Sequence, residues 1–216
     1  YAEEKGMEIK TEFMPHFPLD TTAQLMRIRD WGADFIFVQA IETQATMVLK
    51  DAERLGLTGE VQFILPPHAT PYDVMPLVGE ASDGVWSISI GLLGPDAEGL
   101  PGRELQRRIA EYAVGEGKFD YADAKHGSVY PYPYMLVELL RAVAAEVGGI
   151  ENVDGAAVYN FMANRVWEFD PGGLQLPFHW EPGKRLLTSS FVLYEMRGGE
   201  LHRLTDLIKP PQIIEP

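Results

Sequence analysis

The stretch Asp34-Phe35-Ile36-Phe37-Val38 decides the fold class of this 216-residue chain. A short, continuous apolar run of this kind is typical of a parallel strand that is covered on both faces. We therefore expect both of its phenylalanines to lie in the core, together with Trp86 of a later run. The same pattern predicts strands at Val61 to Leu65 and at Gly84 to Ile90.

Helical patterns fill the intervals between these strands. The expected helices run from Asp20, as the N-cap, to Trp31-Gly32, from Thr43 to Gly56, and from Thr70-Pro71 to about Val78. A further strand is expected before them, at Glu8 to Phe13. Strands and helices that alternate in this way build a parallel sheet with right-handed crossovers, and such sheets bind ligands beyond the carboxyl ends of their strands.

The pattern changes at Gly91, where a Gly- and Pro-rich stretch to Gly102 marks a candidate boundary. Three helices are expected after it, over residues 103–114, 131–147 and 153–164. The second of these has a broad apolar face, made of Leu136, Leu139, Leu140, Val143 and Val147. The last expected element is a hairpin of residues 191–196 and 201–207, with a tight turn at Gly198-Gly199.

The charge of the chain excludes two classes of partner. It has 18 Lys and Arg residues against 32 Asp and Glu residues, a net charge of −14 at pH 7. Nucleic-acid phosphates and anionic lipids both require a basic surface, so we expect no nucleic-acid partner and no direct docking on a membrane. The absence of cysteine excludes disulfides, thiolate metal sites and a cysteine nucleophile.

Motifs for catalysis are missing as well. The sequence has no Gly-x-Ser-x-Gly, Ser-x-x-Lys or His-Glu-x-x-His pattern, and its five histidines are scattered. We therefore expect no catalytic residue, no metal and no cofactor. A hydrolase built on an α/β sheet stays open as a third hypothesis for the function, behind the two given below.

Two clusters provide the candidate ligand-binding residues, and the first lies at the strand ends. Gln39, Ile41 and Glu42 follow one predicted strand, and Pro67 and His68 follow the next. The ends of neighbouring parallel strands meet at one edge of a sheet, where ligands bind. Ordinary strand-to-helix loops are the alternative interpretation.

The second cluster opens the long helix of the second half. Tyr130 and Tyr132 belong to the sequence Tyr130-Pro131-Tyr132-Pro133-Tyr134. Three tyrosines in five residues would line an apolar pocket with hydroxyl groups that orient a ligand. The alternative is a rigid helix entry that packs on the core, which we favour for Tyr134.

Six segments of the sequence carry a resemblance to a known family. They are Tyr1 to Ile9, Phe17 to Leu25, Gly32 to Val38, Gly79-Glu80-Ala81-Ser82-Asp83-Gly84-Val85, Tyr134 to Val143, and Tyr194 to Ile208. In this order, over nearly the whole chain, they resemble the leucine/isoleucine/valine-binding protein family. These proteins are type I periplasmic solute receptors of ABC transporters.

The resemblance implies a type I periplasmic-binding-protein fold, in which a parallel sheet with flanking helices forms each of two lobes. It implies that the N-terminal lobe is largely missing and that the chain begins inside a domain. Residues 1–90 would complete the second lobe, residues 91–186 would supply a crossover and helices of the first lobe, and residues 187–216 would form a hairpin that crosses back.

The resemblance also implies a function. The chain would be the substrate-binding receptor of an ABC importer, in the periplasm or on the extracytoplasmic cell surface. It would capture a small solute between the lobes and deliver it to a membrane permease, with membrane contact only through the permease or a lipid anchor. The alternative is a ligand-sensing domain of the same fold in a regulatory protein.

The ligand is less clearly implied. In family members that bind amino acids, a carboxylate pairs with the ligand's ammonium, and its position falls near Pro67 and His68 here. Since neither residue is acidic, Glu42 would have to supply that charge, because a buried ammonium without a counter-charge is costly. Otherwise an aromatic acid or an amide fits the site better.

Overall fold

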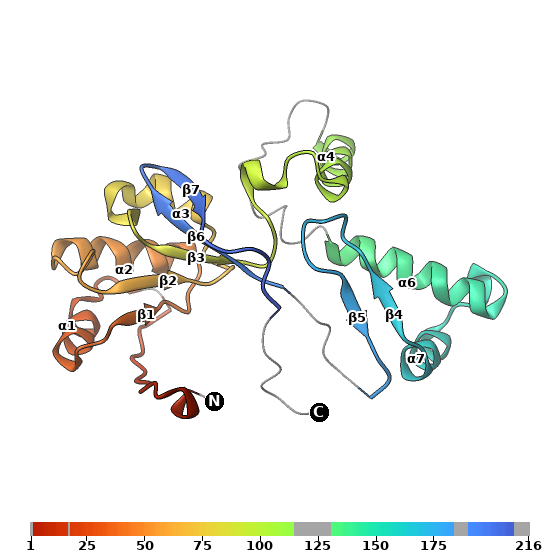
Figure 1. Ribbon diagram of the computed structural model, residues 1–216, viewed down its shortest axis with the longest axis horizontal. Helices are drawn as coiled ribbons and strands as arrows, with labels where there is room; N and C mark the ends of the chain where they lie inside the picture. The colour runs from red at the N-terminus through yellow and green to blue at the C-terminus, as the bar shows by residue number, and fades with distance from the viewer. Residues whose placement is uncertain (1, 17, 115–130, 184–189, 210–216) are drawn as a thin grey trace. The chain divides into compact units, whose positions relative to one another are not determined.

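The computed structural model of the chain describes residues 2–16, 18–114, 131–183 and 190–209 (Figure 1). The described residues form two compact units. Unit 1 comprises the residues up to Ser89 and the segment Leu193–Asp206, and unit 2 comprises Ile90–Val192 and the residues from Leu207 onward. The chain therefore passes between the units three times.

Unit 1 is built on a five-stranded sheet in the order β1-β2-β3-β6-β7. Its strands are β1 (Phe35–Phe37), β2 (Gln62–Leu65), β3 (Trp86–Ser89), β6 (Val192–Arg197) and β7 (Glu200–Arg203). The predicted parallel pairing is confirmed for β1 with β2 and for β2 with β3. The predicted hairpin is confirmed as well, since β6 and β7 are antiparallel and joined through Gly198 and Gly199 at φ angles of 61° and 76°.

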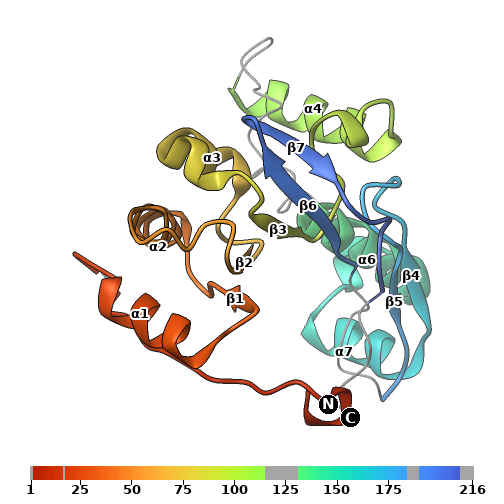
Figure 2. The same ribbon diagram turned by 60° about the vertical axis from the view of Figure 1, so that its left-hand side comes forward.

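The described part of unit 1 has three α-helices, which lie along one side of β1, β2 and β3 (Figure 2). They are α1 (Thr22–Trp31), α2 (Glu42–Arg54) and α3 (Pro71–Val78), accompanied by the short 3-10 helices η1 (Glu3–Lys5) and η2 (Gly79–Ser82). The predicted stop at Gly32 and the predicted start at Thr70-Pro71 are confirmed.

Two of the predicted helix caps are wrong. The N-cap of α1 is Thr21, because its carbonyl accepts the first helical hydrogen bond, from the amide of Leu25 at 3.1 Å, and the carboxylate of Asp20 accepts from the amide of Thr22 at 2.7 Å. The N-cap of α2 is Ile41, which has extended backbone, and Thr43 lies inside the first turn. In both cases the helix begins within two residues of the predicted start.

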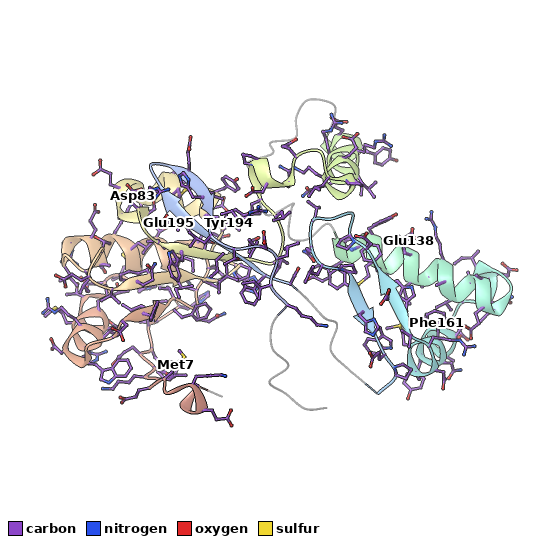
Figure 3. All side chains as sticks on the ribbon, in the orientation of Figure 1. Met7, Asp83, Glu138, Phe161, Tyr194 and Glu195 are labelled. Carbon is purple, nitrogen blue, oxygen red and sulfur yellow. The ribbon has the colours of Figure 1, made fainter. Side chains whose placement is uncertain are left out.

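The core of unit 1 lies between the sheet and these helices. Ile36, Phe63 and Leu65 point to this side and are 9 % exposed or less. The helices contribute buried apolar residues to it, chiefly Leu25, Ala45, Val48, Leu49, Ala52 and Val74. Tyr194 and Met196 of β6 are also buried, and the carboxylate of Asp83 holds the end of the β6–β7 hairpin by accepting from the amide of Gly198 at 2.8 Å (Figure 3).

The prediction that Phe35, Phe37 and Trp86 lie in the core is wrong, because their side chains lie on the other side of the strands. Phe35 is 57 % exposed and Phe37 is 52 % exposed, so neither belongs to the core. Trp86 is only half-buried, with its ring centroid 6.3 Å from that of Phe35. The reason is that the helices of unit 1 cover only the face to which Ile36 points, whereas the apolar run predicts cover on both faces.

The strand predicted at Glu8 to Phe13 is wrong too. Within the described part of the chain, no backbone hydrogen bond joins residues 8–13 to another segment, and a strand exists only where a neighbour completes its ladder. Side chains hold this segment against α1 instead. Arg27 pairs with Glu12 at 2.7 Å, and the ammonium group of Lys10 lies 5.4 Å from the ring centroid of Trp31.

The described residues of unit 2 form three α-helices, near the predicted positions, and a small sheet. The helices are α4 (Pro101–Val114), α6 (Pro131–Val147) and α7 (Gly155–Asn164), with the 3-10 helices η3 (Gly94–Ala97) and η4 (Ile150–Asn152). The antiparallel strands are β4 (Trp167–Phe169) and β5 (Phe178–Trp180). Neither strand is predicted from the sequence, because three residues are too few to show an alternating pattern.

The apolar face predicted for α6 is only partly buried. Leu139 and Val143 are buried, whereas Leu136 is 52 % exposed. Aromatic rings join the start of this helix to the small sheet. Tyr132 lies 5.8 Å from Phe178, measured between ring centroids. Figure 3 shows Glu138 further along α6 and Phe161 on α7.

Candidate ligand-binding site

Five of the seven predicted residues lie at one edge of the sheet in unit 1. The parallel register sets Phe37 of β1 beside Ile64 of β2, so both strands end at the same edge. The amide of Val38 still donates to the carbonyl of Ile64, at 3.0 Å. The residues that follow the two strands form what we term the strand-end site: Gln39, Ile41, Glu42, Pro67 and His68.

A tight turn presents the second half of this site. The amide of Ala69 donates to the carbonyl of Pro66 at 3.1 Å, which leaves Pro67 and His68 as the two central residues of a turn. Proline is suited to the first of these positions because its φ angle is preset. Pro66 and Ala69 are buried and His68 is exposed, so buried neighbours hold a solvent-facing imidazole in place.

The first half of the site is the start of α2. Ile41 is 46 % exposed and precedes the helix without a side-chain capping bond. Glu42, in the first turn, is half-buried. The N-terminus of a helix carries partial positive charge, which favours carboxylates such as that of Glu42 and also anionic ligands.

The start of α3 reaches the same edge and also has no side-chain cap. The hydroxyl of Thr70 donates to the carboxylate of Asp73 instead of accepting from a helix amide. Two helix N-termini therefore follow the two strand ends. Around them the site combines an amide, a carboxylate, an imidazole and two apolar side chains, which can hydrogen-bond a small ligand and pack against it.

One buried polar group near this site is not among the predicted residues. Gln44, in the first turn of α2, is 5 % exposed. Its Nε2 donates to the carbonyl of His16 at 2.5 Å, while its Oε1 has no hydrogen-bond partner among the described residues. A buried acceptor of this kind requires a donor. The available signal was a glutamine at a position where the helical spacing requires an apolar residue.

Of the other two predicted residues, Tyr130 lies outside the described residues, and Tyr132 belongs to unit 2, where it is 39 % exposed. Tyr134 packs edge-on against the buried ring of Phe169 at 5.3 Å, as expected for a tyrosine at a packed helix entry.

Two cavities in unit 2 contain none of the predicted residues. One, of about 570 Å³, is lined by Glu98, Gly99, Leu100, Pro101, Arg103, Glu104 and Arg107. The other, of about 490 Å³, lies between α6 and β4.

Across the described ranges, no three His, Asp or Glu side chains form a group that could hold a metal ion. In the same ranges, no helix is both long enough and apolar enough to cross a membrane.

Comparison with solved structures shows the fold. The chain superposes on a branched-chain amino acid ABC transporter protein from Thermus thermophilus with bound valine, at a TM-score of 0.71 and 19 % identity, covering 97 % of this chain and 55 % of that one. It also superposes on a solute-binding protein from Rhodopseudomonas palustris HaA2 in complex with p-hydroxybenzoic acid, at a TM-score of 0.70 and 21 % identity, covering 96 % and 54 %.

A third similar structure is a fatty acid ABC transporter substrate-binding protein from Thermomonospora curvata, with a TM-score of 0.66 and 14 % identity over 97 % of this chain and 52 % of that one. The chain thus spans about half the length of each of these proteins. Among curated proteins, no sequence matches it significantly.

The mixed sheet with flanking helices is part of the type I periplasmic-binding-protein fold. The sequence itself matches the family model described as periplasmic binding protein over residues 1–200. This chain therefore belongs to the periplasmic binding protein family.

Proposed function

We propose that the chain is part of the substrate-binding receptor of an ABC importer, located in the periplasm or on the extracytoplasmic cell surface. It binds a small solute with the strand-end site and delivers it to a membrane permease. The observation that carries this proposal is the convergence of Gln39, Ile41, Glu42, Pro67 and His68 at the carboxyl edge of two parallel strands. These side chains offer hydrogen bonds, one negative charge and apolar contact, which are the interactions that a solute receptor uses.

The ligand class follows from the same residues. The uncapped starts of α2 and α3 favour a carboxylate or an amide carbonyl. Ile41 and Pro67 offer apolar contact to an aliphatic or aromatic body, and Gln39 and His68 offer hydrogen bonds. We therefore propose an aromatic acid, an amide or an amino acid, with Glu42 pairing with the ammonium group in the last case. The valine and p-hydroxybenzoic acid named for the two similar structures support these classes.

The proposal is tested by isothermal titration of the complete polypeptide encoded by the gene. The ligands are branched-chain amino acids, hydroxybenzoates, aromatic amides and a medium-chain fatty acid. We expect one class to bind with a Kd in the micromolar range or below and to raise the Tm, because a ligand at a hundred times its Kd adds about 2.7 kcal/mol of stability.

Two results would contradict the proposal. One is the absence of binding in every class. The other is chemical conversion of a bound compound, detected by mass spectrometry of the titrated mixture. Such a conversion would favour the hydrolase hypothesis. The Lys50→Ala variant is the matched control, since Lys50 is exposed on α2 and lies outside the strand-end site. It should bind as the parent does.

A further inference from the structure

The cavity between α6 and β4 in unit 2 shares no residue with the strand-end site (Figure 1). Its volume of about 490 Å³ is within the range of sites that bind small molecules. We term it the α6–β4 groove and define it by the side chains that carry its chemistry: Glu138 and Arg141 of α6, Trp167 and Phe169 of β4, and Asp170, which follows β4. Glu138 is labelled on α6 in Figure 3.

One wall of the α6–β4 groove is aromatic. Trp167 and Phe169 are two residues apart on β4 and therefore point to the same side of the strand. Their rings are nearly parallel, at 15°, with centroids 6.2 Å apart. Phe169 is buried and also contacts Tyr134 of α6 edge-on at 5.3 Å, whereas Trp167 is only half-buried. The groove therefore presents part of a well-supported indole ring to a flat apolar group.

The polar groups of the groove are held in place by bonds within the protein. Nη1 of Arg141 donates to Oε1 of Glu138 at 2.6 Å. Oδ1 of Asp170 accepts from the amides of Gly172 and Gly173, at 2.8 and 3.3 Å. Among the described residues, these are the hydrogen bonds of the three side chains, so further guanidinium donors and one oxygen of each carboxylate remain available to a ligand. Groups that are fixed before binding cost little entropy when they bind.

The charges of the groove restrict what it can bind. Arg141 disfavours an organic cation, and the carboxylates of Glu138 and Asp170 disfavour an anion. An apolar ligand would remove water from these charged groups without replacing its hydrogen bonds, which is costly. A neutral ligand with both donors and acceptors and with one flat apolar face satisfies all these conditions. A pyranose sugar has these properties, because its hydroxyl groups donate and accept and its ring C–H groups form a flat face.

We propose that the α6–β4 groove binds a neutral pyranose sugar. The C–H face of the sugar packs on the ring of Trp167, and its hydroxyl groups form hydrogen bonds with Glu138, Arg141 and Asp170. This site is additional to the solute site at the strand ends, and its occupation does not depend on the proposed transport function.

Fluorine NMR tests this proposal on the complete polypeptide encoded by the gene, labelled with 5-fluorotryptophan. The resonance of Trp167 is the one that is absent from Trp167→Phe. The probes are methyl β-D-glucopyranoside, methyl α-D-mannopyranoside and cellotriose, and mannitol is the control because it has hydroxyl groups but no ring face. We expect at least one pyranose probe to shift the Trp167 resonance with a Kd of about 1 mM or below, and mannitol to leave it unchanged. No shift with any pyranose, or an equal shift with mannitol, overturns the proposal.

A pair of arginine variants tests the polar side of the groove by isothermal titration with the same probes. Arg141 and Arg108 are 71 % and 72 % exposed, and each pairs with a glutamate of its own helix, but Arg108 lies on α4, outside the groove. Arg141→Met should raise the Kd of the sugar at least about fivefold, because hydrogen bonds to a charged group are lost. Arg108→Met should leave it unchanged. Equal Kd values for the two variants overturn the proposal. This comparison remains decisive if Trp167→Phe does not fold, since both arginines are on the surface.

Discussion

Thr21 donates two hydrogen bonds to one oxygen of Asp51. Its backbone amide lies 2.7 Å and its hydroxyl 2.8 Å from Oδ2. The other carboxylate oxygen, Oδ1, accepts from Nη2 of Arg54 at 2.8 Å. Thr21 is 1 % exposed and Asp51 is 7 % exposed, so this is a buried and well-satisfied network. It ties the residue before α1 to the last turn of α2.

The first prediction concerns the stability provided by this network. Asp51→Ala leaves the amide and hydroxyl of Thr21 buried without an acceptor, which is more costly than the loss of an exposed contact. We expect the free energy of unfolding to fall by about 2 to 4 kcal/mol, measured by urea denaturation of the complete polypeptide. Glu53→Ala, at an exposed position of the same helix, is the control. Equal effects of the two substitutions would contradict the prediction.

The second prediction is an acid dependence from the same carboxyl group. Burial alone would raise the pKa of Asp51, but the hydrogen bonds from Arg54 and Thr21 outweigh it and hold the pKa below its usual value of 3.8. This contribution to stability is therefore present above about pH 4 and is lost as the pH falls through the lowered native pKa.

Comparison with Asp51→Asn isolates this effect from the other carboxyl groups. The difference in unfolding free energy between the parent and this variant should shrink as the pH is lowered from 6 toward about 2, as urea denaturation at each pH will show. A difference that does not change with pH would refute the assignment to Asp51.

The third prediction concerns His179 in unit 2, whose ring bridges two carboxylates. Nδ1 lies 2.8 Å from Glu168 and Nε2 lies 2.8 Å from Glu181. A neutral imidazole has only one N–H, so both contacts are donor–acceptor bonds only in the protonated form. The hydrogen bonds that the ring donates to Glu168 and then to Glu181 raise the pKa of His179 above its usual 6.5.

This contribution to stability is fully present below pH 6.5 and is lost as the pH rises through the raised native pKa. An NMR titration should place the pKa of His179 above 6.5 in the parent, and lower in Glu168→Gln. Glu151→Gln, an exposed position in the same unit, should leave the titration unchanged. If the pKa of His179 is the same in Glu168→Gln as in the parent, the ion pair with Glu168 does not form in solution.

The fourth prediction concerns close backbone packing at the start of α4. A Cβ atom at Gly102 would meet the carbonyl oxygen of Pro171 far inside van der Waals contact, and the amide of Gly102 donates to the carbonyl of Gly172 at 3.0 Å. Gly102→Ala should therefore destabilise the protein by about 1 to 3 kcal/mol, measured by thermal or urea unfolding.

The control for this substitution is Gly155→Ala in α7. No atom lies within 4 Å of a Cβ added at Gly155, and alanine favours helix, so this variant should be neutral or more stable by up to about 1 kcal/mol. If Gly102→Ala behaves like Gly155→Ala, the two segments are not packed as described.

The fifth prediction tests the strand-end site. Glu42→Ala and His68→Ala should each weaken binding of the ligand identified by titration by about tenfold or more, equal to about 1.4 kcal/mol. Both should leave the urea midpoint close to that of the parent, since neither residue is buried. Glu53→Ala, at the other end of α2, should bind normally. Unchanged affinity in both site variants would show that the ligand binds elsewhere.

Much of unit 1 could be predicted because its signals are local. The apolar runs at β1, β2 and β3, the glycine after α1 and the Thr70-Pro71 start of α3 act through backbone geometry and short-range periodicity. The strand-end site could be anticipated for the same reason, since parallel strands necessarily end at one edge. The hydrogen bond of Gln44 could not, because its side-chain amide donates to the carbonyl of His16, 28 residues away in the chain.

The sequence by itself determined the order of strands and helices from α1 to β3, the parallel pairing of β1 with β2, and the residues that follow these strands. These features depend on chain periodicity, turn residues and the handedness of crossovers, all of which are local. Only the tertiary structure decided that Phe35 and Phe37 are exposed, that residues 8–13 form no strand, and that β4 pairs with β5. Burial and strand pairing depend on which segments are present to cover a face or complete a ladder, and an apolar run of sequence does not contain that information.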